Sequence, residues 1–334
     1  MKLVSNLFRT TFILLILIVG QQTVMSQSKP VDKEKVKAVL HFSDSTGATQ
    51  ALVMYGSEVI GSFKATDCDS IYMNTASMVK SWTSLAVGIL IDQGNITSVD
   101  DLVCQYLPEW KSGCENNVTI KHLLTMSSGL LKIRPASESI LAQDDMNKFA
   151  LAQRVTIEPG KKFSYSNEGV QILGILIERV SSQNADAFFR ENLFTPLDMD
   201  STSLYKDKAG NDIVYGGAKT TVQDASKVGL LLLNKGRYQG RQVVSESWIK
   251  KSITPSSISD NYGYLLWIDP SNQNSSMRNY AAMGDLGQMT IVFPQKNLIY
   301  IRQQSCINED IPNLSWMGPN FINLVGSIIN TELD

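Results

Sequence analysis

The clearest periodic pattern in the chain runs from Met78 to Leu90, where apolar residues recur at spacings of three and four. Thr75 is a plausible N-cap before this run, and Gly94 supplies a stop after it. Apolar residues cover nearly the whole circumference of the expected helix. The pattern therefore predicts a helix that is buried on all sides.

Runs rich in β-branched and aromatic residues near both ends of the chain predict strands. At the start, two such runs flank the turn-prone DSTGAT and suggest an antiparallel hairpin, with a second turn near Gly56. A final helix is expected near 321–329. The predicted strands are 38–42, 51–63, 262–268, 289–293 and 298–303. Strands at both ends imply one sheet to which both termini contribute.

Between these strands the chain is mainly helical segments punctuated by Pro and Gly: SVDDLVCQYLPEW, TIKHLLTMSSGL, GVQILGILIERVSS and ADAFFREN. We expect one α+β domain over residues 37–334. Its α/β lobe would comprise about 37–95 and 221–334, and an inserted helical lobe about 96–220. A cleft between two such lobes is where a site is expected.

The N-terminus has the layout of an export signal. Lys2 and Arg9 precede the apolar run TTFILLILIVG, and a polar segment follows it. We expect a signal peptide over 1–26, cleaved after Ser26, then a linker over 27–36, which predicts a secreted or periplasmic protein. An uncleaved membrane anchor is the alternative.

Composition excludes several classes of function. The formal charge is −2, and loss of the two basic residues of segment 1–26, which contains no acid, makes it −4, so nucleic acid is not an expected partner. His41 and His122 are the only histidines, and no Cys-x-x-Cys or His-Glu-x-x-His occurs, so no metal is expected. No Gly-rich phosphate loop is present, and we expect no cofactor. Both histidines are interpreted as structural, His41 within a strand.

Four cysteines in an exported chain allow three disulfide pairings, and the sequence leaves the choice open. They are Cys68, Cys104, Cys114 and Cys306. Cys104 and Cys114 are the closest pair along the chain. Four free thiols packed as small hydrophobic groups remain an alternative.

Candidate chemistry begins with Ser77 and Lys80, which share one face of the first turn of the predicted buried helix. The same Ser-x-x-Lys spacing recurs at Ser203/Lys206 and Ser247/Lys250, so the spacing alone is weak. A lysine can take a serine proton only if burial or nearby positive charge lowers its pKa. The apolar surroundings of Lys80 meet that requirement.

Several ordered segments resemble the serine β-lactamase and penicillin-binding-protein family, near its class C, esterase and 6-aminohexanoate-dimer hydrolase branches. They are SMVKSWTSLAVGILIDQG, SVDDLVCQYLPEW with TIKHLLTMSSGL, PGKKFSYSNEGVQILGILIE, YGGAKTTVQDASKVGLLLLNKG and GDLGQMTIVFP. The resemblance implies the β-lactamase/transpeptidase-like fold. It implies Ser77 as nucleophile, Lys80 as base, Tyr165 as proton relay, and Asn167 as a residue that holds substrate or Lys80. Tyr72 and Asn74 share the Tyr-x-Asn spacing but lie too close to Ser77.

The third family motif departs from its usual form. The resemblance places Asp285-Leu286-Gly287 where the family has Lys-Thr-Gly or His-x-Gly, and the backbone N–H of Gln288 in the oxyanion hole. The family's cation, which holds a substrate carboxylate, is missing. An ionised Asp285 about 6 Å from Lys80 would stabilise the ammonium by about 3 kcal/mol, opposing its use as a base. Asp285 therefore either points away from Lys80 or lies further along the cleft, where it would attract a cationic group.

These observations predict an exported serine hydrolase that cleaves an ester or amide through a Ser77 acyl-enzyme, with a small molecule as substrate. A D-alanyl-D-alanine carboxypeptidase or β-lactamase is the alternative enzyme. A catalytically silent homologue that binds cell-wall fragments or a partner is the alternative outside enzymes. Natural substrate and oligomeric state stay open.

Overall fold

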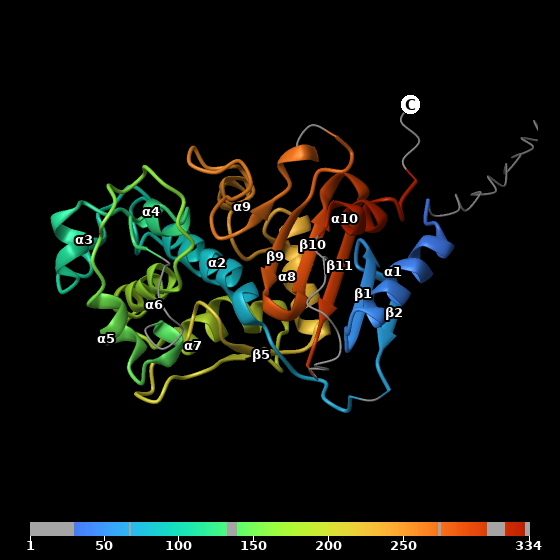
Figure 1. Cartoon of the computed structure of the whole chain (residues 1–334), viewed down its shortest axis with the longest axis horizontal. Coiled ribbons are helices and arrows are strands. Elements are labelled where there is room, and N and C mark those ends of the chain that lie inside the picture. The colour runs from blue at the N-terminus through green and yellow to red at the C-terminus, as the bar shows by residue number, and fades with distance from the viewer. Residues whose placement is uncertain (1–29, 67, 132–138, 273–274, 306–317, 331–334) are drawn as a thin grey trace, which may run out of the picture. The chain divides into compact units, whose positions relative to one another are not determined.

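The computed structural model describes residues 30–66, 68–131, 139–272, 275–305 and 318–330 (Figure 1). The predicted signal peptide lies outside the described residues. The main sheet has six antiparallel strands in the order β2-β1-β11-β10-β9-β8 (Figure 1). Their bounds are β1 Gln50–Tyr55, β2 Glu58–Lys64, β8 Trp267–Ile268, β9 Tyr280–Gly284, β10 Gln288–Phe293 and β11 Leu298–Gln303. The predicted α+β class, with one sheet built from both ends of the chain, is confirmed.

Alternation along the strands gives the sheet two apolar faces. Val53 on β1 and Ile291 on β10 belong to the core under α1 (Lys33–Ser45) and α10 (Pro319–Gly326). Their neighbours Leu52 and Val292 belong to the larger core on the opposite face, where α8 (Val222–Leu233) packs on β10 and β11. The sheet is therefore covered by helices on both sides.

Helix α2 (Val79–Asp92) confirms the predicted buried helix, since every residue from Val79 to Leu90 is buried. It contacts β9 of the sheet as well as helices α6 (Asn167–Ser181) and α9 (Glu246–Ser252), so it links the sheet to the helical part of the chain (Figure 1). The other helices are α3 Lys111–Glu115, α4 Ile120–Leu124, α5 Met146–Leu151 and α7 Ala185–Phe189. Among the described residues, none of the helices is both long enough and apolar enough to cross a membrane.

The first predicted strand, 38–42, is wrong, because this segment belongs to α1. Asp32 caps the helix by accepting hydrogen bonds from the backbone N–H groups of Glu34 and Lys35. Val36 and Val39 are buried at helical spacing. His41 is therefore helical, and α1 begins inside the segment 27–36 expected as a linker. The apolar run 38–42 was too short to separate the two periods.

Other strand predictions hold in part. The hairpin predicted across DSTGAT is wrong, since its first strand is part of α1, but the second turn near Gly56 is confirmed, as are β10 and β11. Of 262–268, only Trp267–Ile268 is a strand, because Leu265 has a positive φ of 57° that extended structure excludes. The sequence pattern did not predict strand β9.

The middle of the chain is less helical than predicted. SVDDLVCQYLPEW forms a single 3₁₀ turn at Val103–Gln105. Two short strands, β4 (Ser203–Leu204) and β5 (Ala218–Thr220), lie inside the predicted helical lobe and pair with each other, and β5 also pairs with β3 (Met73–Asn74) just before Ser77. Strands β6 (Arg237–Tyr238) and β7 (Arg241–Gln242) form a separate hairpin.

Cys104 and Cys114 form a disulfide, which selects one of the pairings that the sequence left open. Cys68 is also disulfide-bonded, and Cys306 lies outside the described residues. The alternative of free thiols is wrong for the cysteines that the structure describes.

Candidate active site

Ser77 and Lys80 lie where the sheet meets α2. Ser77 is half-buried in the 3₁₀ turn Ala76–Met78 that leads into α2, and Lys80 is 1% exposed. The Lys80 Nζ donates a hydrogen bond of 2.9 Å to the Ser77 Oγ and a second one to the backbone carbonyl of Tyr215. The predicted nucleophile and base are therefore within proton-transfer distance.

The turn before Ser77 is held in a strained conformation. Ala76 has a positive φ of 45°, a region that costs a non-glycine residue about 1–3 kcal/mol. The side chain of Asn74 accepts a hydrogen bond from the Ala76 N–H at 2.9 Å, and the Thr75 hydroxyl accepts one from the Ala218 N–H. Thr75 is at the N-cap position but makes no side-chain cap bond, so its predicted role as a cap is replaced by this link to β5.

The Lys80 ammonium group lies over the ring of Tyr165. The Lys80 Nζ is 4.9 Å from the centre of the Tyr165 ring and 5.6 Å from that of Tyr215. Burial raises the pKa of Tyr165 to about 12, a hydrogen bond with Ser77 acts in the opposite direction, and the charge of Asp285 adds to the rise. Tyr165 is therefore a neutral phenol at physiological pH, in contact with the nucleophile.

Asn167 is the first residue of α6, which follows the cap residue Ser166. The Ser166 hydroxyl accepts from the Gly169 N–H and donates to the Glu168 carboxylate, so this end of the helix is firmly held. The Oδ1 of Asn167 is buried and has no hydrogen-bond partner among the described residues. A buried acceptor without a partner is unusual and marks a position where a ligand group could donate.

The strand that borders the nucleophile turn is β9, and its last residue, Gly284, makes the close contact. A Cβ at Gly284 would lie 2.4 Å from the Thr75 carbonyl oxygen and 3.0 Å from the Met78 backbone nitrogen. Only glycine allows this approach. By geometry the third motif is thus Ala282-Met283-Gly284, three residues before the predicted Asp285-Leu286-Gly287, and it also lacks a cation.

The prediction that Gln288 supplies an oxyanion N–H is wrong, because that N–H donates to the Asp285 carbonyl within the β9–β10 turn. The Gln288 side chain bonds both backbone groups of Gln304, at 2.6 and 3.1 Å. Gly287 is buried in the same turn with a positive φ of 79°. Gln288 and Gly287 therefore hold the turn together.

Asp285 is exposed, and its charge reaches Tyr165 strongly enough to raise the pKa of that phenol. Asp285 is therefore close enough to the candidate site for its charge to act on Tyr165. The exposed Leu286 follows it with a positive φ of 60°.

An aromatic wall, missed in the sequence, continues from Tyr165. Trp267 on β8 stacks on the Tyr165 ring, with the centres 6.1 Å apart, and Tyr262 packs edge-on against both rings. Phe163 extends the cluster. The predicted strand over 262–268 contained two of these residues, but only the tight bend at Leu265 brings them together.

The competing motifs take structural roles. Lys206 pairs with the buried Asp212 at 2.6 Å, and the exposed Ser247 bonds Ser245, the N-cap residue of α9. His122 accepts a hydrogen bond from the Thr119 N–H and completes a capping box, which confirms its structural interpretation. No group of three or more potential metal ligands occurs among the described residues.

Comparison with known proteins shows that the chain is similar to hydrolases. Residues 49–302 match the Beta-lactamase family. The 6-aminohexanoate-dimer hydrolase of Paenarthrobacter ureafaciens is 26% identical over 296 residues, which cover 82% of this chain and 68% of that protein. Protein flp of Staphylococcus aureus (strain COL) is 28% identical over 144 residues, covering 40% of this chain and only 29% of flp. A solved family VIII carboxylesterase shares the fold, with a TM-score of 0.68 at 17% identity over 90% of this chain and 99% of that one.

Proposed function

This chain belongs to the beta-lactamase family, and we propose that it is an exported serine hydrolase that cleaves an ester or amide bond through a covalent Ser77 acyl-enzyme. The observation that carries the proposal is the 2.9 Å hydrogen bond between the Lys80 Nζ and the Ser77 Oγ inside a buried helix start. Export rests on the N-terminal sequence alone.

In the first half-reaction Ser77 attacks the substrate carbonyl carbon while Lys80 takes its hydroxyl proton. Lys80 is buried and lies within hydrogen-bond distance of the Ser77 Oγ, so it is placed to accept this proton. The ammonium that forms is stabilised by the Tyr215 carbonyl and by the two tyrosine rings. The neutral Tyr165 phenol then passes its proton to the departing alkoxide or amide nitrogen as the scissile bond breaks, and it recovers a proton from the Lys80 ammonium.

Two backbone segments are suited to stabilise the oxyanion. The N–H of Ser77 lies in the first turn of a helix, where N–H groups have no partner within the helix. The Gln288 N–H is already bonded to the Asp285 carbonyl, so it is not available as the second donor. The second donor is a backbone N–H at the end of β9, where Gly284 contacts the turn that holds Ser77. Water then hydrolyses the Ser77 ester.

The 6-aminohexanoate-dimer hydrolase and the carboxylesterase among its relatives favour an amide or ester substrate. The third motif has no cation in either placement, which disfavours a β-lactamase or D-alanyl-D-alanine carboxypeptidase that must hold a carboxylate. A silent binding homologue would have no need of Ser77, Lys80 and Tyr165 in contact.

The test is turnover of a short neutral p-nitrophenyl ester beside a chromogenic cephalosporin, with wild type and Ser77→Ala. We expect ester turnover with little cephalosporin turnover, and a loss of about 10³-fold or more in Ser77→Ala. Mass spectrometry should detect an acyl adduct on the Ser77 peptide. A Ser77→Ala protein that turns over the ester at the full rate would refute the mechanism, and fast cephalosporin hydrolysis would favour a β-lactamase.

A further inference from the structure

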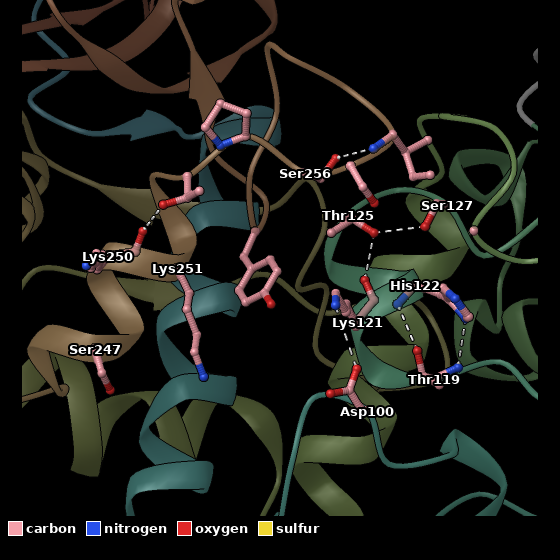
Figure 2. A pocket seen from close by; sticks show the side chains of 16 residues that line it. Asp100, Thr119, Lys121, His122, Thr125, Ser127, Ser247, Lys250, Lys251 and Ser256 are labelled. Atoms are coloured by element: carbon pink, nitrogen blue, oxygen red, sulfur yellow. Dashed lines mark hydrogen bonds and ion pairs between the residues drawn. The ribbon is translucent and has the colours of Figure 1, made fainter. Parts of the chain in front are cut away.

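A large pocket lies between α4 and α9, away from the catalytic residues (Figure 2). Its volume is about 790 Å³, within the range of small-molecule sites. We call it the α4–α9 pocket. It is lined by Asp100, Thr119, Lys121, His122, Thr125, Ser127, Gly160, Ser247, Lys250, Lys251, Thr254, Pro255, Ser256, Ser257, Ile258 and Tyr264. Ser77, Lys80 and Tyr165 do not line it.

The charge of this pocket is opposite to that of the whole chain. Three lysines line it and one aspartate, whereas the chain has a formal charge of −2. Lys251 comes from the last turn of α9 and Lys121 from α4, on opposite walls (Figure 2). Lys121 is 3.8 Å from Asp100, an exposed pair that contributes little. Lys251 has no ion-pair partner among the described residues, so the pocket carries unneutralised positive charge.

His122 adds an uncharged donor. Its Nδ1 accepts the Thr119 N–H at 3.2 Å, so the proton of the neutral ring is on Nε2. Burial, and then the charge of Lys121, lower the pKa of His122, which keeps the ring neutral. A Cβ at Gly160 would lie 3.2 Å from that Nε2, so glycine leaves the donor edge of the ring uncovered.

Hydroxyl groups and one ring complete the pocket. The hydroxyls of Thr125 and Ser127 are hydrogen-bonded to each other at 2.8 Å, and both residues are buried (Figure 2). Ser256 contributes a further hydroxyl from the segment after α9. Tyr264 lines the pocket with a mostly buried ring, 9% exposed, that packs against Trp248. Ammonium groups, hydroxyls and an aromatic face together match a ligand that is both anionic and rich in hydroxyl groups.

We propose that the α4–α9 pocket is a second binding site, for a small sugar that carries a phosphate or carboxylate group. Lys121 and Lys251 bind the oxyanion from the two walls. The His122 Nε2–H and the hydroxyls bind the sugar oxygens, and the ring packs on Tyr264. The site is separate from the ester or amide chemistry at Ser77.

The test is calorimetric titration of the full-length protein with glucose 6-phosphate, with glucuronate and with glucose. The test variant is Lys121→Ala/Lys251→Ala. Its matched control is Lys111→Ala/Lys148→Ala, which removes the same charge from exposed lysines of α3 and α5. We expect saturable binding of glucose 6-phosphate or glucuronate, weakened by added salt, at least about tenfold weaker in the test variant and unchanged in the control.

Whichever of the two anions binds more tightly identifies the acidic group, and unchanged ester turnover in both double variants shows that they are folded. Three results would overturn the proposal: no binding of either anion, equal binding of glucose, or an equal loss of affinity in both double variants. An unaltered affinity in Lys121→Ala/Lys251→Ala would place the ligand elsewhere.

Discussion

The two sides of the candidate active site are built in different ways. On one side, which we call the helical wall, the side chains of Ser77, Lys80 and Tyr165 contact one another. On the other side, which we call the strand wall, the backbone of β9 at Gly284 contacts the nucleophile turn, and the Gln288 side chain ties the following β9–β10 turn to Gln304. A site built from side chains can be recognised in a sequence by residue types at a fixed spacing. A site built from backbone groups is marked only by a glycine, which many other positions share.

The largest effect is expected from Gly284→Ala, which adds a Cβ where β9 contacts the nucleophile turn. The new Cβ would collide with the Thr75 carbonyl oxygen at 2.4 Å, and neither backbone can move without displacing Ser77. We expect a loss of stability of about 1–3 kcal/mol, as in other overpacked sites. Ester turnover should fall about 10²-fold, since a small displacement of a nucleophile has effects of that size. Denaturant unfolding and steady-state kinetics measure the two effects.

The matched control is Gly216→Ala, because a Cβ there meets no atom within 4 Å and the residue has no positive φ. That variant should keep both stability and turnover. If Gly284→Ala behaves like Gly216→Ala, the strand wall does not hold the nucleophile turn and our placement of the third motif is incorrect.

The helical wall is tested by Tyr165→Phe, which keeps the ring over Lys80 but removes the hydroxyl. We expect a loss of about 10²-fold in kcat/KM, the usual contribution of a positioned proton donor. Tyr300→Phe is the control, since Tyr300 is a buried tyrosine whose pKa is also raised to about 12, far from Ser77 in the core under α1 and α10. Normal turnover by Tyr165→Phe would remove that residue from the mechanism.

The same pair of variants has a pH signature. The pKa of Tyr165 is about 12 in the folded protein and about 10 in an unfolded chain, so its phenol stabilises the folded state fully below pH 10. Between pH 10 and 12 the unfolded chain loses the proton first, and the free energy of unfolding falls. Both Phe variants should therefore show a flatter decline with pH than wild type, and only Tyr165→Phe should lose activity.

The sequence predicted the helical wall well, because burial of Lys80 follows directly from apolar neighbours at helical spacing. It could not predict the carbonyl of Tyr215, which accepts from Lys80, since every residue carries a carbonyl. The third motif was predicted three residues late because the sequence does not distinguish Gly284 from Gly287. Only the contact with Thr75 shows that Gly284 is the glycine next to the nucleophile turn. The short run 38–42 failed for another reason, since capping by Asp32 decided between helix and strand.

The smallest expected effect concerns Asp285, whose charge reaches Tyr165. Asp285→Lys replaces an exposed carboxylate with an ammonium, which should attract anionic substrates and raise the acylation rate by a β-lactam. Because Asp285 is exposed, solvent screens the effect, and we expect about a threefold to tenfold change at low salt that shrinks as salt is added. Neutral ester turnover should change little. Asp200→Lys, at an exposed position next to the turn before β4, makes the same charge change and should alter neither rate. An equal gain in both variants would mean that net charge alone attracts the β-lactam, and the strand wall would then act through its backbone only.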